Sequence, residues 1–474
     1  MALPIDDAQS DPRRQRLVLL AVCLGMFMMQ LDATVVNVAL PTIGADLDSS
    51  ATELQWVVDA YVLPLACLLL IGGRLGDRFG HRRVFMAGLL VFAVGSGLCA
   101  VAGSSGQLIG ARVLQGVGAA LELPATLAIL RDTYPDAGER ERAIGIWAGV
   151  AGLALAIGPV LGGGFVDAFG WPSIFVINIP VAVTAIVLAL RAVGEHVNPE
   201  LGGLDALGQV LGTGALGVVA FAAIEGRDRG FGSGLIIGLF IVGLLALASF
   251  VAVERRGSSP VLPPALFADR SFSAVNVAGL VMGFVLFGLL FVFAIFFQRA
   301  EGASAANAGA RFLPLSLTFV IVGPLAGRLI GRAGARILMT VGLAFVGLGC
   351  LLLVPVDAGT TYWYVGTVFA LIGVGYGLTS TPMAAVVMSS APGRLAGIAS
   401  SVNNTARQAG GVFGVAVLGS LLIGRTGTTE TPGSLASGLH AALVVAGVAA
   451  CLAAVVSALF VRGRNREQAE ERAS

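Results

Sequence analysis

The sequence predicts an all-α integral membrane protein. Of its 474 residues, 56% are hydrophobic and only 12% are charged, whereas a soluble domain carries roughly 25% charged residues. Apolar stretches with few charges recur along nearly the whole chain, each long enough for the roughly 20 residues that a membrane helix needs. This distribution excludes a series of soluble domains. The net charge of +1 gives no indication of a nucleic-acid partner.

Fourteen apolar stretches are expected to cross the lipid bilayer. Their boundaries follow from the runs of apolar residues, with an error of a few residues at each end. The expected spans are 17–40, 54–73, 84–103, 107–130, 143–165, 172–191, 204–224, 234–253, 271–297, 304–327, 337–355, 362–384, 396–424 and 436–461.

The absence of lysine excludes two kinds of chemistry. All 29 basic residues are arginine, so the chain has neither a P-loop lysine nor a lysine for a Schiff base. The three histidines, His81, His196 and His440, are isolated, and no GxSxG motif is present. We therefore expect no enzyme, no metal site and no cofactor. The five cysteines lie far apart in apolar stretches, where packing is their expected role.

The arginines indicate the orientation in the membrane. With the N-terminus in the cytoplasm, most of them fall in cytoplasmic segments, and the external segments hold only Arg227, Arg229, Arg299 and Arg425. Positive charge favours the cytoplasmic side. We expect a multi-pass protein of a bacterial cytoplasmic (inner) membrane, with both termini in the cytoplasm.

A weak internal repeat divides the chain. The segment Gly73–Arg82 reappears as Gly327–Arg336, and the same spacing relates the first span to the ninth. We expect two six-helix bundles with two inserted helices between them, a build found in transporters with parallel repeats. The expected parts are an N-terminal tail (1–16), the first bundle (17–193), the insertion (194–270), the second bundle (271–461) and a C-terminal tail (462–474).

The segment 73–83 is expected to be a tight cytoplasmic turn between two spans. It contains Gly73, Asp77, Arg78, Gly80 and Arg82. Glycine permits unusual backbone angles, and Asp77 could pair with an arginine or cap the next helix. Such a charged latch can hold one face of a transporter shut. The alternative is a solvated basic turn, and the repeat of the pattern favours the latch.

Three ionisable residues are expected at similar depth in the outer part of the membrane. Asp32 lies about 12 Å from the outer end of its helix, and Asp59 and Arg112 lie about 8 Å from the outer ends of theirs. An acid there can be neutral when dry and ionised when Arg112 approaches. We predict that Asp32 carries protons, with Asp59 as a second candidate. The alternatives are a static ion pair and, for Asp59, a place among the headgroups.

Glu122 is an acid in the middle of its span, ten residues after Arg112. A residue of this kind is a functional candidate by default, because its charge is costly in the membrane. It could recognise a cationic substrate or form a second proton site. A locally hydrogen-bonded, neutral acid is an equal alternative.

The fifth span contains Gly152, Gly158, Pro159, Gly162 and Gly163. A Gly-Pro step bends a helix and small neighbours let another helix approach. This pattern favours a role in coupling, with ordinary helix packing as the alternative.

The second half carries arginines within two spans. We interpret Arg311 and Arg407 as lining a polar substrate cavity, with a structural hydrogen-bond network as the alternative. Three further polar residues accompany Arg407: Asn403, Asn404 and Gln408.

These motifs together resemble the major facilitator superfamily, and more narrowly its 14-helix drug:proton antiporter branch. The resemblance covers about 17–461 and combines several motifs that are only moderately specific alone. They are Leu31–Pro41, Gly73–Arg83, Leu108–Gly118, Gly158–Gly163, Trp171 with Ile174–Pro180, and Asn403–Gln408.

The resemblance implies a major facilitator fold and efflux of a small amphipathic drug or antibiotic, driven by the proton gradient. It implies functional roles for Asp32, Asp59, Asp77 and Arg112, and we expect a monomer that works by alternating access. The sequence departs from the family pattern at Pro172-Ser173 and at Glu122, which is consistent with a dedicated exporter of the producer's own metabolite. A facilitator without proton coupling or a nutrient symporter is the main rival, ahead of a receptor or an enzyme.

Overall fold

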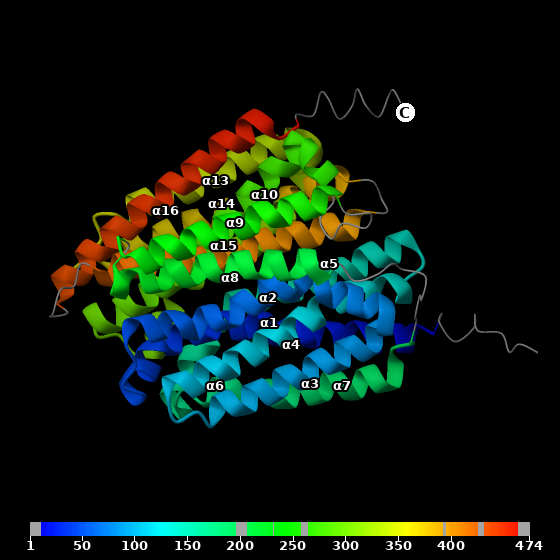
Figure 1. Cartoon of the computed structure of the whole chain (residues 1–474), viewed down its shortest axis with the longest axis horizontal. Helices are drawn as coiled ribbons and strands as arrows, with labels where there is room; N and C mark the ends of the chain where they lie inside the picture. Colours follow the sequence, from blue (N-terminus) through cyan, green and yellow to red (C-terminus); the bar gives the residue numbers. More distant parts are fainter. Residues whose placement is uncertain are drawn as a thin grey trace, which may run out of the picture.

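The computed structural model describes residues 11–195, 206–230, 232–256, 264–391, 395–424 and 431–462. All regular structure in these ranges is helical, which confirms the expected all-α class (Figure 1). Within these ranges thirteen helical stretches, some formed by two consecutive helices, are long and apolar enough to cross a membrane, and Val210–Gly226 is a shorter apolar stretch. This shorter stretch corresponds to the seventh expected span, 204–224. Most of both expected tails and part of the linkers in 194–270 lie outside the described residues.

The first set of helices covers the first six expected spans. They are α1 (Pro12–Asp46), α2 (Ala51–Phe79), α3 (His81–Ala100), α4 (Ser105–Thr133), α5 (Ala137–Phe169), α6 (Ser173–Val176) and α7 (Asn178–Ala192). Within this set α4 packs between α2 and α3, while α1 packs against α5 and α7.

The second set repeats this packing. It comprises α10 (Arg270–Ile295), the π-helical η2 (Phe296–Ala300), α11 (Ala305–Ala310), α12 (Leu313–Ala333), α13 (Ala335–Leu352), α14 (Tyr362–Ser389), α15 (Ala396–Gly424) and α16 (Pro432–Phe460), preceded by the short 3₁₀ helix η1 (Pro264–Ala268). Here α14 packs between α12 and α13, while α10 packs against α15 and α16. The partners correspond one for one to those of the first set, so the weak sequence repeat is also a repeat of helix packing.

Two expected spans are interrupted, and prolines account for both breaks. The stretch 172–191 was predicted as one helix but consists of α6 and α7, and 304–327 consists of α11 and α12. Proline has no backbone N–H to bond the carbonyl four residues earlier. Pro180 stands four residues after Val176, where α6 ends, and Pro314 stands four residues after Ala310, where α11 ends.

The prediction of a turn over residues 73–83 is wrong for most of that segment. Residues 73–79 form the end of α2, and a single residue, Gly80, separates α2 from α3. Gly80 has a φ of 99°, a region that L residues rarely adopt. Gly334 has a φ of 79° at the matching point between α12 and α13. One glycine with positive φ is thus sufficient to reverse the chain in both halves.

The two sets meet along α2–α15, α5–α12 and α1–α10. We call the end of the bundle that contains Asp46 the distal end, and the end that contains Pro12 the proximal end. Near the distal end, Gln298 Nε2 donates to the Val38 carbonyl at 2.9 Å and the Ala306 N–H donates to Asp167 Oδ2 at 3.0 Å. Direct hydrogen bonds therefore tie the two sets together there.

The inserted helices α8 (Ala206–Arg229) and α9 (Gly234–Arg256) pack on each other, and α8 contacts both α2 and α15 (Figure 1). Trp56 of α2 anchors the insertion, since its indole N–H donates to Glu225 Oε1 at 3.2 Å and its ring lies 5.7 Å from that of Phe221. Helices α8 and α9 thus cover part of the interface between the two sets.

We expect Gly80→Ala to lower the midpoint of thermal unfolding of the purified protein in detergent. An L residue with positive φ costs about 1–2 kcal/mol, and the new Cβ would lie 1.7 Å from Glu195 Oε1. Gly331→Ala is the matched control, because a Cβ there meets no atom within 4 Å. Removing a helical glycine should stabilise by about 0.5–1 kcal/mol. Equal midpoints for the two variants would contradict this account of the turn.

Candidate functional site

A buried polar network lies within the first helix set, centred on Asp32 of α1. Arg112 of α4 pairs with Asp32 Oδ2, and both side chains are at most 1% exposed. Asp32 Oδ1 accepts from Gln115 Nε2 at 3.1 Å and from Asn178 Nδ2 at 2.9 Å. Ser96 Oγ of α3 accepts from the same two amides, at 2.8 and 3.3 Å. Four helices, α1, α3, α4 and α7, therefore contribute to one site.

Arg112 is held on several sides. Its Nε donates to the Val57 carbonyl of α2 at 3.0 Å, and its Nη1 donates to Gln115 Oε1 at 2.8 Å. Its guanidinium carbon lies 4.4 Å from the centre of the Tyr61 ring and 5.8 Å from that of Phe175. A cation over an aromatic face is attracted by the ring. The arginine is thus positioned for Asp32 before any ligand arrives.

The donors around Asp32 stabilise its ionised form. A buried carboxylate is tolerated when it is paired and hydrogen-bonded. Three donors from Arg112, Gln115 and Asn178 reach its two oxygens. Removing one partner from a buried ion pair leaves an uncompensated charge, which is more costly than the pair itself is stabilising.

Asp32 and Arg112 were expected at one depth, and the structure brings them together. No role was predicted for Gln115, Asn178 or Ser96. A signal for Gln115 was present, because it stands three residues after Arg112 and so on the same face of α4. Asn178 follows the break between α6 and α7, and the sequence alone does not indicate where its side chain points.

Asp59 and Glu122 stand apart from this network. Both are at most 1% exposed, and neither carboxyl has a hydrogen-bond partner. Glu122 is packed between helices rather than open to a cavity: a Cβ on Gly25 of α1 would lie 2.0 Å from Glu122 Oε1, and a Cβ on Gly88 of α3 would lie 3.1 Å from Glu122 Cβ. Among the described residues these are two acids without a counter-charge.

The glycines of α5 fit against two different helices. A Cβ on Gly158 would lie 2.0 Å from Thr34 Oγ1, and one on Gly162 would lie 2.1 Å from Val35 Cγ2, so both face α1. A Cβ on Gly163 would lie 2.2 Å from the Ala305 carbonyl oxygen of the other set. Pro159 presents its carbonyl to Gly309 of α11. Gly152 has more room, with Val320 3.9 Å away.

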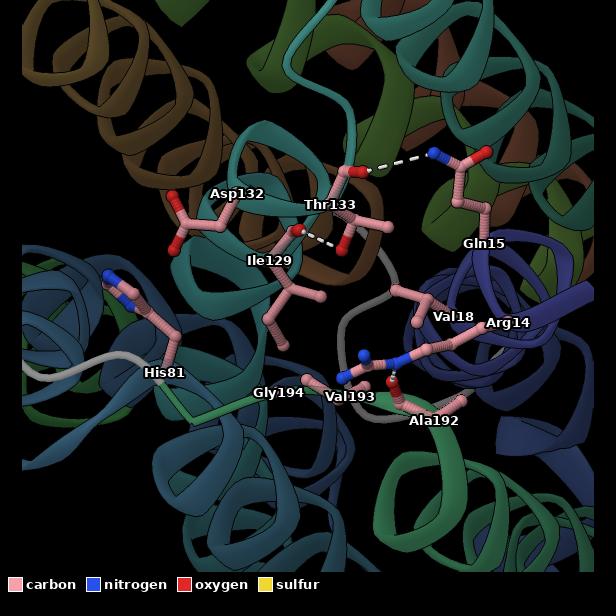
Figure 2. Close-up of a pocket in the computed structure, with 10 residues that line it drawn as sticks. All are labelled: Arg14, Gln15, Val18, His81, Ile129, Asp132, Thr133, Ala192, Val193 and Gly194. Carbon is pink, nitrogen blue, oxygen red and sulfur yellow. Dashed lines mark hydrogen bonds between the residues drawn. The ribbon is translucent and has the colours of Figure 1, made fainter. Parts of the chain in front are cut away.

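The end of α2 lies beside a small cavity at the proximal end. Asp77 pairs with His81 at 3.4 Å rather than capping α3, which has no side-chain cap. Arg78 lies over the Phe79 ring, and Arg82 donates to the Leu190 carbonyl of α7 at 3.0 Å. The cavity, of about 30 Å³, is enclosed by α1, α3, α4 and the end of α7 (Figure 2). Its lining includes Arg14, Gln15, Val18, His81, Ile129, Asp132, Thr133, Ala192, Val193 and Gly194.

The polar residues of the second half do not form one cluster. Arg311 lies between α11 and α12, where it pairs with Glu301 and lies over the Phe297 ring at 4.8 Å. On α15, Arg407 Nη2 donates to Asn404 Oδ1 at 2.9 Å. Asn403 faces α10 and donates to the Val275 carbonyl at 3.1 Å, and Gln408 is buried on the same helix.

A larger, mostly apolar pocket of about 470 Å³ lies between α8, α9 and α15. Its volume is within the range of small-molecule sites. Ser420 supplies a buried hydroxyl without a partner. The other lining residues are Val219, Ala223, Gly226, Gly230, Phe240, Phe413, Val417, Leu421 and Gly424.

The sequence profile of the Major Facilitator Superfamily matches residues 22–415. The chain belongs to this superfamily of membrane transporters. It is 36% identical over 456 residues to the methylenomycin A resistance protein of Bacillus subtilis, covering 96% of both chains. It is 35% identical over 410 residues to the tetracenomycin C resistance and export protein of Streptomyces glaucescens, covering 86% of this chain and 76% of that protein.

A solved structure confirms the fold of the transporter. The crystal structure of a bacterial homologue of the human lysosomal transporter Spinster superposes with a TM-score of 0.68 and 19% identity, covering 96% of this chain and 98% of that one. The superfamily consists of transporters rather than enzymes. In the described part of this transporter, no three His, Cys, Asp or Glu side chains gather in a way that could hold a metal ion.

We expect Arg112→Ala to destabilise the transporter by about 3–5 kcal/mol, because it leaves the buried Asp32 charge without its partner. The double variant Asp32→Asn/Arg112→Ala should recover part of that loss, since the neutral amide needs no counter-charge. The measurement is thermal unfolding of both variants, and of Asp32→Asn alone, in the same detergent. Losses that simply add in the double variant would show that the two residues do not interact.

Proposed function

We propose that this transporter exports small amphipathic drugs or antibiotics across the bacterial cytoplasmic membrane in exchange for protons. The observation that carries the proposal is the fully buried Asp32–Arg112 pair on helices of the first set. The names of two relatives that match most of the chain include resistance, and one of these names also includes export. The buried pair supports a protonatable site, and the relatives support drug efflux as its use.

Proton coupling follows from the competition for Asp32. When Arg112, Gln115 and Asn178 surround the carboxylate, it is stable without a proton. When Arg112 moves away, a buried carboxylate becomes costly and takes up a proton instead. Protons thus bind when the site opens outward and leave when the network re-forms. Asp59, which has no hydrogen-bond partner, is a second proton acceptor in the same helix set.

The distribution of arginine supports the proximal end as the cytoplasmic end, with both termini inside. The substrate then enters from the cytoplasm or the inner leaflet. The hydrogen bonds of Gln298 and Asp167 between the two helix sets keep the distal, outer end closed in this structure. Outward release requires them to part, which is alternating access by rocking of the two sets.

The residues suggested for the substrate differ in charge. Arg407, Asn404 and Gln408 suit polar or anionic groups, whereas Glu122, the acid suggested for cations, is packed between helices. The apolar pocket beside Ser420 offers a lateral site for the apolar part of an amphipathic molecule. A resistance profile of a pump-deficient host that expresses this chain identifies the substrate class. Resistance to a single compound would favour a dedicated exporter of the producer's own metabolite.

A facilitator without proton coupling and a nutrient symporter are the competing functions. Inverted membrane vesicles that accumulate the drug found in the resistance profile distinguish them. A protonophore should collapse the accumulation. Unchanged accumulation would exclude proton coupling, and uptake in the opposite direction would favour a symporter.

We expect Asp32→Asn to abolish proton-driven export while leaving a folded, inserted protein, because the amide imitates the protonated acid. Energy-independent exchange of substrate across the membrane should persist, since exchange does not require release of the proton. Both are measured in proteoliposomes with the same drug. Uphill export at the wild-type rate would show that Asp32 is not the obligatory carrier.

We expect Gly163→Ala to hold the distal end apart, because its Cβ would lie 2.2 Å from the Ala305 backbone. Gly164→Ala is the matched control, since a Cβ there meets nothing within 4 Å. Spin labels at the exposed Phe169 and Trp363 positions report the separation of the two sets at that end. The distance should lengthen in Gly163→Ala and stay unchanged in Gly164→Ala, and the same distance in both variants would contradict the proposed closure.

A further inference from the structure

A series of buried polar groups extends from Asp32 toward the cavity at the proximal end, inside the first helix set. On α1, Val18, Gly25 and Asp32 follow one another at intervals of seven residues, which places them on one face of the helix. On α4, Gln115, Glu122 and Ile129 have the same spacing. Asp32 and Gln115, at one end of the two rows, meet in the buried network. Val18 and Ile129, at the other end, line the proximal cavity.

Glu122 stands between these two ends. Its carboxyl lies against Gly25, where an added Cβ would be 2.0 Å from Oε1 and 3.2 Å from the Phe85 ring of α3. It has no hydrogen-bond partner and is 1% exposed. The described residues give it no ion pair from α1, α2 or α3. A carboxyl in such surroundings is more stable neutral, with a proton, than charged.

Tyr61 fills the interval between the two acids. Its ring lies under the Arg112 guanidinium, at 4.4 Å, and its hydroxyl donates to the Met29 carbonyl at 3.1 Å. Met29 lies three residues before Asp32 and four after Gly25, so the hydroxyl is at a depth between Asp32 and Glu122.

The proximal cavity lies at the end of this series. At about 30 Å³ it has room for about two water molecules, since each needs roughly 10–15 Å³. His81 and Asp132 are among the residues that surround it (Figure 2), and His81 Nδ1 is buried without a partner. From Glu122 to Ile129 is about 10 Å along α4, so a proton needs a transient chain of about three water molecules at hydrogen-bond spacing to cross this distance.

We propose that protons leave Asp32 for the cytoplasm through the interior of the first helix set, with Glu122 as an intermediate proton-binding site, rather than through the substrate path between the halves. This inference rests on the proposed proton coupling. Protonated Asp32 gives up its proton as Arg112 pairs with it, and that proton passes within the first helix set to the Glu122 carboxylate, which takes it up. Glu122 then passes one proton to water in the proximal cavity.

The proton on Glu122 is tested directly by infrared difference spectroscopy of the purified transporter between neutral and alkaline buffer. The wild type should lose a protonated-carboxyl band at alkaline pH. Glu122→Gln should lack this band, and Asp32→Asn should retain it. A band that is unchanged in Glu122→Gln would overturn the assignment.

The route is tested by export in proteoliposomes, with the drug to which the expressing host becomes resistant as the probe. Glu122→Gln should slow uphill export at least tenfold and leave energy-independent exchange and the KM for exchange unchanged. Thr126→Val is the control, because the Thr126 hydroxyl already donates to Leu123 of its own helix at 2.7 Å. It should behave as the wild type.

The two hypotheses fail separately. If a protonophore collapses wild-type export and Glu122→Gln still exports at the wild-type rate, the interior route is wrong while proton coupling stands. If the protonophore has no effect on the wild type, proton coupling itself is wrong.

Discussion

The ion pair between Asp32 and Arg112 is the constraint on which the rest of the first half depends. Two opposite charges that are almost completely removed from water persist only if further donors and acceptors complete their hydrogen bonds. Gln115 and Asn178 supply these, and Ser96 Oγ of a third helix accepts from both of their amides. The interruption between α6 and α7 lets Asn178 reach the site at the start of a helix. The ion pair and its hydrogen-bond partners therefore help to fix the positions of four helices.

The helices themselves depend on a few small residues. Gly80 and Gly334 allow two helices to follow each other with a one-residue turn in each half. Gly163 of α5 and Gly309 of α11 allow the backbones of the two sets to touch near the distal end. A contact between backbones has no flexible side chain that can adjust gradually. It is either made or broken, and such behaviour suits a transporter with two discrete states.

Much of the fold could be predicted from the sequence because membrane helices appear there as long runs of apolar residues. The helical class, the repeat of Gly73–Arg82 and the shared depth of Asp32 and Arg112 are of this kind. The breaks at Pro180 and Pro314 were missed because a short helix before a proline has the same apolar composition as a continuous span. The turn at Gly80 was predicted too long, since the charges of residues 73–79 are compatible with the end of a helix. Side-chain partners were harder still: Arg311 pairs with Glu301 across a helix break, which spacing does not indicate.

The central claim, that Asp32 exchanges its proton for the substrate, is tested most directly by proton release during binding. Purified transporter in weakly buffered detergent solution, with a pH indicator, receives the drug identified by the resistance profile. The account predicts that the wild type releases protons on binding and that Asp32→Asn binds the drug without releasing them. Equal proton release by the two proteins would contradict the claim.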